Sequence, residues 1–309
     1  MSEKLYFYDL DTPVDGQEYL FLQSMLPEKR LEELKGKKES FVREKMMGEC
    51  LTRMAACEWF WKNPVCQGIV KGMPFNGEAE DSGGLPQKTD KREDTYVLPE
   101  RLADNREEAD VLLERMADNW EEADVLPEQI TVVRMFRKEV SEEQISWMRG
   151  LQIQQEKGGK KYFANYPDIY FNVSHSGHRL VCAVSDVPVG VDIEKPAEAK
   201  NVIKIVKRFF HAKEIERFEM LAKEGVDPAV EFQRLWTMKE AYLKCTGAGL
   251  SGGMDGYRFE KDENTDEYYV VEDAPSEVII RHTEYKLRQF MDEENYVTTI
   301  CIKKMENNA

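Results

Sequence analysis

The sequence has no long hydrophobic run, few histidines and no closely paired cysteines, and each absence excludes a class of protein. No window approaches the roughly 20 apolar residues that a helix needs to cross a bilayer. The N-terminus lacks a basic stretch followed by an apolar one, so we expect no secretory signal there. The six cysteines are scattered without a CxxC pair, which is typical neither of a structural zinc site nor of a disulfide scaffold. These absences predict a cytoplasmic protein that is not bound to a membrane.

Several common catalytic and nucleotide-binding motifs are missing as well. The chain contains no GxxxxGK[ST], GxGxxG, GxSxG or HExxH. Without them, the P-loop, Rossmann, α/β-hydrolase and zincin interpretations are excluded. The chemistry of this chain must therefore be carried by residues outside these motifs.

The charge is strongly negative but unevenly distributed. The 309 residues include 59 Asp+Glu and 43 Lys+Arg, which gives a formal net charge of −16. Residues 76–129 contain 17 acidic and 6 basic side chains, a net charge of −11, so the rest of the chain carries only −5. Such acidity argues against a nucleic-acid partner, because Lys and Arg contacts to phosphates supply much of the affinity for nucleic acids. A hydrophobic content of 41% is nevertheless sufficient for a folded core, and the length suggests about two globular units.

The acidic stretch contains a tandem repeat of 14 residues. VLPERLADNREEAD at 97–110 is followed by VLLERMADNWEEAD at 111–124, with 11 of the 14 positions identical. So few copies cannot form a self-supporting solenoid. We interpret the segment from about residue 62 to residue 140 as a solvent-exposed acidic insertion in the first of two subdomains. The alternative is an acidic arm that contacts a partner.

Helical and strand-like patterns alternate outside this stretch. Apolar spacing predicts helix from residue 28 to about 61, over 202–210 and 213–221, and over 232–244. A capping box at 141–144 predicts a further helix start. Residues 180–184 and 189–194 are predicted as an outgoing and a returning strand, and the C-terminal part alternates as antiparallel strands. The pattern is that of an α+β fold, with subdomains at 1–189 and 190–309.

The segment Gly190–Glu194, with the sequence GVDIE, places two carboxylates on one face of a strand. Val191 and Ile193 then point to the core, whereas Asp192 and Glu194 share the opposite face, about 6.6 Å apart along the strand. Mg²⁺ is commonly held by one or two carboxylates together with substrate phosphates. The alternative is an ordinary solvent-facing strand.

A second candidate segment lies on the predicted helix at 232–244. Trp236, Glu240 and Lys244 are spaced by four residues and therefore lie along one face. Glu240 and Lys244 could form a plain surface ion pair. They could equally supply a third metal ligand and a cation directed at a pyrophosphate.

A third segment, FNVSHSG at 171–177, follows Gly158–Lys161 and contains one of only four histidines. His175 lies between two serine hydroxyls, and histidine, serine and lysine together can form a phosphate-binding edge. The alternative is a histidine whose role is structural.

Together, FNVSHSG, GVDIE and WTMKEAYLKCTGAGL resemble the 4′-phosphopantetheinyl transferases of the surfactin (Sfp) type. The resemblance covers residues 3 to about 61 and about 145 to 303. The Gly-Lys-Pro that usually precedes FNVSHSG in the family reads Gly159-Lys160-Lys161 here. Further matching positions are Pro27–Arg30, Arg43, Arg208–Phe210 and Gly249–Ser251.

The resemblance implies a pseudo-two-fold pair of similar α+β subdomains with the active site between them. It implies transfer of the 4′-phosphopantetheine arm of coenzyme A to a serine of an acyl or peptidyl carrier protein, with release of 3′,5′-ADP. The carrier could serve fatty-acid, polyketide or nonribosomal-peptide synthesis. We expect a monomer with neither nucleic acid nor membrane as a partner.

The resemblance also assigns site residues. Mg²⁺, with Mn²⁺ as an alternative, would be held by Asp192, Glu194 and Glu240. Glu240, or a water on the metal, would accept the serine proton, and Lys244 would neutralise the leaving diphosphate. The coenzyme A phosphates would be bound by Lys29, Arg43, Lys160, Ser174, His175, Lys239 and Lys244. His175, with Arg43 nearby, would meet the ribose 3′-phosphate.

Two other functions use the same residues differently. One is a Mg²⁺-dependent phosphotransferase or phosphodiesterase of another kind, built on the same three carboxylates. The other is a carrier-binding protein whose catalytic site has decayed.

Overall fold

The structure is a computed structural model of the whole chain. It describes residues 3–11, 14, 16–62, 130–132, 140–196, 202–249, 253–265, 267–273 and 279–304, with the backbone alone at 62 and 130–132. The chain divides into two compact units, 1–59 with 125–309, and 60–124. The tandem repeat at 97–124 and nearly all of the predicted acidic insertion lie outside the described residues. No helix in the described part of the chain is both long and apolar enough to cross a membrane.

The first sheet of the larger unit has four strands in the order β2-β1-β6-β5. β6 (Arg179–Ser185) is fully buried and pairs antiparallel with β1 (Glu3–Asp9) on one edge and with β5 (Tyr170–Ser176) on the other. β2 (Ile130–Val132) pairs parallel with β1. Residues 130–132, which lie within the range predicted as an insertion, thus belong to this sheet.

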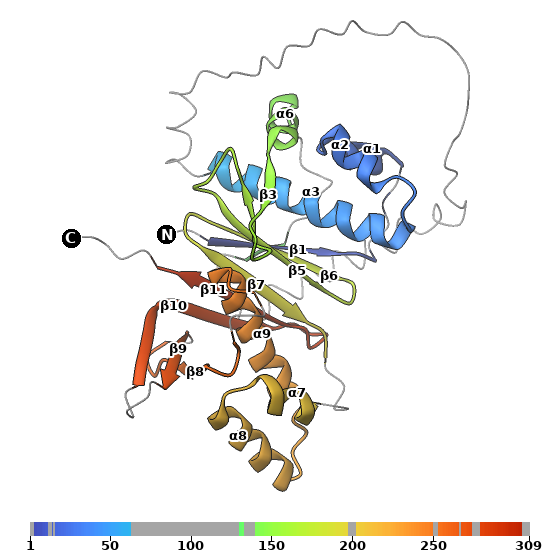
Figure 1. The fold of residues 1–309 in the computed structure, drawn as a ribbon. Coiled ribbons are helices and arrows are strands. Elements are labelled where there is room, and N and C mark those ends of the chain that lie inside the picture. The colour runs from blue at the N-terminus through green and yellow to red at the C-terminus, as the bar shows by residue number, and fades with distance from the viewer. Residues whose placement is uncertain are drawn as a thin grey trace, which may run out of the picture. The chain divides into compact units, whose positions relative to one another are not determined.

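Short helices and one long helix accompany this sheet (Figure 1). They are α1 (Gly16–Ser24), α2 (Glu28–Leu34), α3 (Glu39–Lys62) and α6 (Glu142–Gly150), with a small hairpin of β3 (Ile153–Gln155) and β4 (Lys161–Phe163). The predicted helix from residue 28 to about 61 is interrupted after Leu34, where Gly36 adopts a positive φ of 72°. The predicted capping box is confirmed: Ser141 Oγ accepts from the backbone of Gln144, whose side chain accepts from the backbone of Ser141.

The second sheet has five antiparallel strands in the order β7-β11-β10-β9-β8. Their bounds are β7 (Val189–Glu194), β8 (Tyr257–Lys261), β9 (Tyr268–Asp273), β10 (Ile279–Met291) and β11 (Val297–Lys303). β7 does not return along β6 as predicted. Both edges of β6 are already paired, so β7 pairs instead with β11 from the other end of the chain.

The two sheets share one hydrophobic core. Val181 and Ala183 of β6 pack in the same buried cluster as Val191 and Ile193 of β7. The prediction that these two β7 residues face the core is therefore confirmed. Their alternation places Asp192 on the opposite face of the strand.

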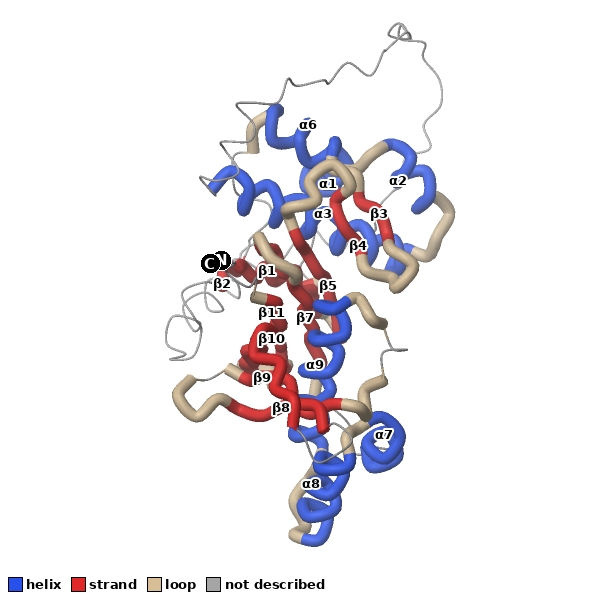
Figure 2. Tube along the Cα trace, turned by 60° about the vertical axis from the view of Figure 1, so that its left-hand side comes forward, coloured by secondary structure: helices blue, strands red, loops and turns tan. Residues whose placement is uncertain are grey.

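The helix α9 (Ala229–Thr246) covers the opposite face of β7, and the two elements lie side by side in Figure 2. The smaller helices α7 (Val202–Phe209) and α8 (Ala212–Lys223) precede it. Only glycine fits at position 190, because an added Cβ would lie 2.1 Å from the carbonyl oxygen of Ala241 and 2.3 Å from the backbone nitrogen of Cys245. Gly190 thus allows α9 to approach the strand that carries Asp192.

This close approach generates a first prediction. Gly190→Ala should lower the free energy of unfolding by about 1–3 kcal/mol, because the added methyl group meets backbone atoms that cannot rotate away. Gly150→Ala is the matched control, since an added Cβ there meets nothing within 4 Å. Urea unfolding of both variants measures the difference. Equal stability of the two variants would contradict the close packing of α9 on β7.

Candidate functional site

The centre of the candidate site is the buried carboxylate of Asp192 on β7. Its side chain is turned to α9 rather than to solvent, and the residue is only 3% exposed. Oδ1 accepts hydrogen bonds from Ser174 Oγ at 2.8 Å and from Lys244 Nζ at 2.6 Å. Burial raises the pKa of Asp192, and the positive charge of Lys244 opposes that rise. The solvent-facing alternative for this part of the strand is therefore excluded.

Two further carboxylates accompany Asp192. Glu194, at the end of β7, accepts a hydrogen bond from Ser176 Oγ at 2.9 Å. Burial raises the pKa of Glu194, and the negative charge of Asp192 raises it further. The pKa of Glu240 on α9 is raised for the same reasons: burial is the larger cause, and the negative charge of Asp192 adds to it. The structure thus brings together the three carboxylates that the motifs singled out, close enough for their charges to repel.

The chemistry of this set, three carboxylates, is that of ligands for a hard divalent cation. The Oδ2 atom of Asp192 is buried and has no hydrogen-bond partner among the described residues. Buried carboxylates that repel one another are stabilised by a cation between them. Within the described ranges, however, no group of three or more His, Cys, Asp or Glu side chains is arranged so that it could hold a metal ion. Carboxylates are nevertheless the side chains that Mg²⁺ takes as ligands, usually only one or two of them together with waters and substrate phosphates.

Strand β5 holds the two carboxylates of β7 through its polar side chains. Ser174 binds Asp192, and Ser176 binds Glu194 while also accepting from the backbone N–H of Lys195 at 3.1 Å. Ser174 is buried and accepts a hydrogen bond from Lys244 Nζ at 2.9 Å. Its hydroxyl therefore positions Asp192 rather than lying open for a phosphate.

Sequence reasoning did not identify two members of this arrangement. The sequence indicates Ser176 only as a hydroxyl beside His175 at a phosphate-binding edge, and it indicates no role for Asn172. Asn172 Oδ1 accepts from the backbone N–H of Val191 at 3.0 Å, so a side chain links β5 to β7. The alternation of polar residues in FNVSHS could have indicated this function, since positions 172, 174 and 176 share one face of a strand.

His175 lies on the other face of β5. Its Nε2 atom is 3.1 Å from Oε1 of Glu44 on α3, and its side chain is 47% exposed. Arg43, the neighbour of Glu44, interacts with the hydroxyl of Tyr8; burial raises the pKa of Tyr8, and the charge of Arg43 opposes that rise. The structure thus places two predicted phosphate ligands, Arg43 and His175, on facing elements of the N-terminal half. The sequence analysis does not indicate Glu44, whose carboxylate lies next to His175.

Lys160 reaches the other end of the site from the turn between β3 and β4. Its Nζ atom donates to the backbone carbonyl of Cys245 near the C-terminal end of α9. Burial lowers the pKa of Lys160. Gly158 in the same turn packs directly on Gly247, since an added Cβ would lie 2.4 Å from that carbonyl oxygen. The glycines before Lys160 therefore let its ammonium group reach the helix that carries Lys244.

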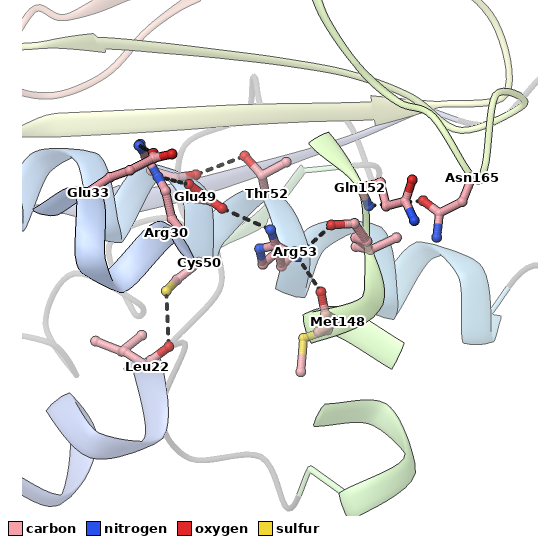
Figure 3. Close-up of polar contacts among 12 residues, drawn as sticks. Leu22, Arg30, Glu33, Glu49, Cys50, Thr52, Arg53, Met148, Gln152 and Asn165 are labelled. Atoms are coloured by element: carbon pink, nitrogen blue, oxygen red, sulfur yellow. Dashed lines mark hydrogen bonds and ion pairs between the residues drawn. The ribbon is translucent and has the colours of Figure 1, made fainter. Parts of the chain in front are cut away.

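A largely buried network of charged side chains links α2, α3 and α6 (Figure 3). Lys29 is exposed on α2. Its neighbour Arg30 donates to Glu49 Oε2 at 2.7 Å, and the other oxygen of Glu49 accepts from Arg53 at 2.8 Å. Arg53 is fully buried and also donates to the backbone carbonyl of Met148 at the end of α6. Arg30 is thus part of the packing, whereas Lys29 is exposed to solvent.

Lys239 requires a correction, because the structure places its ammonium group away from the carboxylates. Its side chain is fully buried and forms an ion pair with Glu214 of α8 at 2.8 Å. It also donates to the backbone carbonyls of Met254 and Tyr257, at 2.8 and 3.0 Å. Burial lowers the pKa of Lys239, and the negative charge of Glu214 opposes that effect. A lysine so enclosed cannot bind a coenzyme A phosphate, so we remove it from the site.

The structural role of Lys239 generates a second prediction. Lys239→Met should lower the free energy of unfolding by about 3–5 kcal/mol, because it leaves Glu214 buried without its partner. Adding Glu214→Gln should recover part of that loss, since glutamine can still serve the capping box at the start of α8. Urea unfolding of both variants measures the effect. A stable Lys239→Met protein that had lost coenzyme A binding would restore the ligand role.

Comparisons with known proteins agree with the motifs. Residues 188–301 match the family model of the 4′-phosphopantetheinyl transferase superfamily. This segment contains Asp192, Glu194, Glu240 and Lys244. The resemblance to Sfp-type transferases that the motifs predicted is therefore confirmed.

Individual curated proteins are similar to parts of this chain. A 4′-phosphopantetheinyl transferase of Bacillus subtilis is 34% identical over 153 residues, which cover 49% of this chain and 63% of that protein. The 4′-phosphopantetheinyl transferase Sfp of Bacillus subtilis (strain 168) is 39% identical over 99 residues, 32% of this chain and 42% of the relative. The mouse L-aminoadipate-semialdehyde dehydrogenase-phosphopantetheinyl transferase is 32% identical over 138 residues, 41% of this chain and 44% of the relative. The chain thus spans less than two thirds of the length of each of these relatives.

Proposed function

We propose that this chain, whose residues 188–301 match the 4′-phosphopantetheinyl transferase superfamily, transfers the 4′-phosphopantetheine arm of coenzyme A to a serine hydroxyl of an acyl or peptidyl carrier protein. The second product would be 3′,5′-ADP. The observation that carries the proposal is the grouping of Asp192, Glu194 and Glu240 beside Lys244. The names of the similar proteins support the same reaction class.

Asp192, Glu194 and Glu240 would hold the Mg²⁺ ion. When bound, this ion would neutralise charge on the pyrophosphate of the donor. The chain prepares the set in advance: Ser174 and Lys244 fix one oxygen of Asp192, and the other oxygen lacks a partner among the described residues. Such preorganisation supplies most of the rate in phosphoryl transfer, because little covalent chemistry is required of the protein.

Lys244 and Glu240 would act on the reacting groups from α9. The side chain of Lys244 is 27% exposed, so its ammonium group can approach the leaving diphosphate while it still pairs with Asp192. Glu240 lies one helical turn before it on the same face and would accept the proton of the carrier serine. Both residues come from the helix that Gly190 allows against β7.

The remaining phosphates of coenzyme A would be bound by Lys29, Arg43, Lys160 and His175. These residues come from α2, α3, the β3–β4 turn and β5, and we expect the donor to lie along them. Ser174 would contribute indirectly, through Asp192 and Lys244. An acidic protein can bind this polyanion because local cations determine the field at the site.

The proposal extends to the architecture. We propose that the two sheets, each accompanied by one long helix, form the pseudo-two-fold pair of subdomains, with the boundary near Val189 at the start of β7. The acidic insertion is proposed as an exposed addition to the first subdomain, and the protein as a cytoplasmic monomer.

A third prediction tests the metal ligands. Asp192→Asn should reduce Mg²⁺-dependent coenzyme A binding and carrier modification by about 100-fold or more, because a charged ligand to the cation is lost. Its melting temperature without Mg²⁺ should stay near that of the wild type, since burial already disfavours the charge. Calorimetry, and mass spectrometry of a panel of apo carriers, provide the two measurements. Asp168→Asn, at an exposed position, is the matched control.

The same assays separate the alternatives. Near-normal turnover of Asp192→Asn would remove this residue from the site. Hydrolysis of the donor by the wild type, without modification of any carrier, would favour another phosphodiesterase or phosphotransferase. Carrier binding without Mg²⁺-dependent coenzyme A binding would favour a decayed enzyme.

A fourth prediction tests recognition of the ribose 3′-phosphate. His175→Ala should lower kcat/KM for coenzyme A about tenfold, the lower end of the range for a charge-assisted hydrogen bond, because the imidazole is half exposed and shared with Glu44. Dephospho-coenzyme A, which lacks this phosphate, should be affected little. A structural role for His175 predicts equal losses for both donors and a lower melting temperature.

A further inference from the structure

The predicted position for the 3′-phosphate already contains a carboxylate. Glu44 Oε1 lies 3.1 Å from Nε2 of His175, and the same oxygen accepts from Lys45 Nζ at 2.7 Å. The hydrogen bond from Lys45 lowers the pKa of Glu44, so the carboxylate is charged at neutral pH. Glu44 is 29% exposed and His175 47%, which leaves both side chains accessible to a ligand.

A phosphate monoester and Glu44 would compete for the same donors. The Nε2–H of His175 is one hydrogen-bond donor, and it points at Glu44 rather than into solvent. Lys45 is engaged by the same carboxylate. A phosphate with nearly two negative charges would have to displace Glu44 from both donors, or bind while repelled by it.

This position is separated from the reacting groups by the strand itself. Ser174 and Ser176 point from β5 to the carboxylates of β7, whereas His175 points from the other face to α3. A change at Glu44 can therefore alter recognition of the donor without disturbing Asp192 or Glu194.

We propose that Glu44 is a specificity-determining residue that weakens selection for the ribose 3′-phosphate, so that the chain also uses donors of the dephospho-coenzyme A class. This inference rests on the proposed transferase function. Glu44 occupies His175 and Lys45 when no phosphate is present, and its negative charge opposes a donor that carries one. A donor with a free 3′-hydroxyl meets neither obstacle.

The test is a variant that should gain selectivity, which damage to the fold cannot mimic. Glu44→Gln removes the charge and keeps the shape. It should raise the ratio of kcat/KM for coenzyme A to that for dephospho-coenzyme A by about 5- to 30-fold, the Coulomb energy of one to two charge pairs at contact distance in water. Glu216→Gln makes the same change in net charge at an exposed position of α8 and should leave the ratio unchanged.

Two double variants show which side chain is responsible for the gain in selectivity for coenzyme A. In Glu44→Gln/His175→Ala, most of the increase should disappear, because the imidazole freed by the first change is gone. Glu44→Gln/Lys45→Gln should lose the part that comes from the lysine. Calorimetry with adenosine 3′,5′-bisphosphate and with 5′-AMP supplies a readout that needs no carrier protein: only the bisphosphate should bind more tightly to Glu44→Gln.

The outcomes distinguish this inference from the function beneath it. If the wild type transfers the arm but Glu44→Gln leaves both the donor ratio and the bisphosphate affinity unchanged, the specificity role of Glu44 is overturned. An equal gain for both donors or both nucleotides would overturn it too. If the wild type neither transfers the arm nor binds these nucleotides, the proposed function itself fails.

Discussion

The candidate site depends on one buried carboxylate, Asp192, held where β5, β7 and α9 meet. Burying an unpaired charge costs several kcal/mol, and a nearby cation offsets that cost only when the geometry is good. Here Lys244 and Ser174 share one oxygen of Asp192, while the other has no partner in the described part of the chain. A buried carboxylate oxygen that lacks a partner is typical of a site prepared for a ligand rather than of a structural ion pair. The backbone makes this possible, because Gly190 lets α9 lie directly on β7.

Strand β5 uses its two faces for two tasks. The hydroxyls of Ser174 and Ser176 face β7 and orient the carboxylates of Asp192 and Glu194. His175, one position along from each serine, faces α3 and Glu44. The period of two along a strand therefore separates the side chains that orient the two carboxylates from the one that faces α3, although all three come from one short motif.

Nearby lysines differ in role because they differ in burial and in the nearest carboxylate. Lys239 and Lys244 are five residues apart on α9, yet Lys239 is enclosed with Glu214, whereas Lys244 pairs with Asp192 at the edge of the site. Lys160 binds a carbonyl at the end of the same helix. Net charge, which is strongly negative, indicates none of this; the local arrangement decides what each cation does.

The sequence by itself determined the features that depend on short-range periodicity. It placed Val191 and Ile193 in the core, found the capping box at Ser141, and identified motifs whose resemblance to the 4′-phosphopantetheinyl transferases the comparisons confirm. These inferences succeed because side-chain direction in a strand or a helix start follows from neighbouring residues alone. The spacing on the helix left Glu240 as either a surface ion pair or a third metal ligand, and the resemblance favoured the second, since Glu240 lies far along the chain from Asp192.

Only the tertiary structure decided the features that depend on distant partners. The pairing of β7 with β11 rather than β6, and the strand at residues 130–132, arise because strand edges are satisfied by segments remote in sequence. The burial of Lys239 against Glu214, and the contact of Glu44 with His175, join residues from separate elements whose packing no local pattern specifies. A spacing rule predicts which way a side chain points, but what it meets there is set by the fold, because the cost of burial and the strength of an ion pair depend on every group that surrounds it.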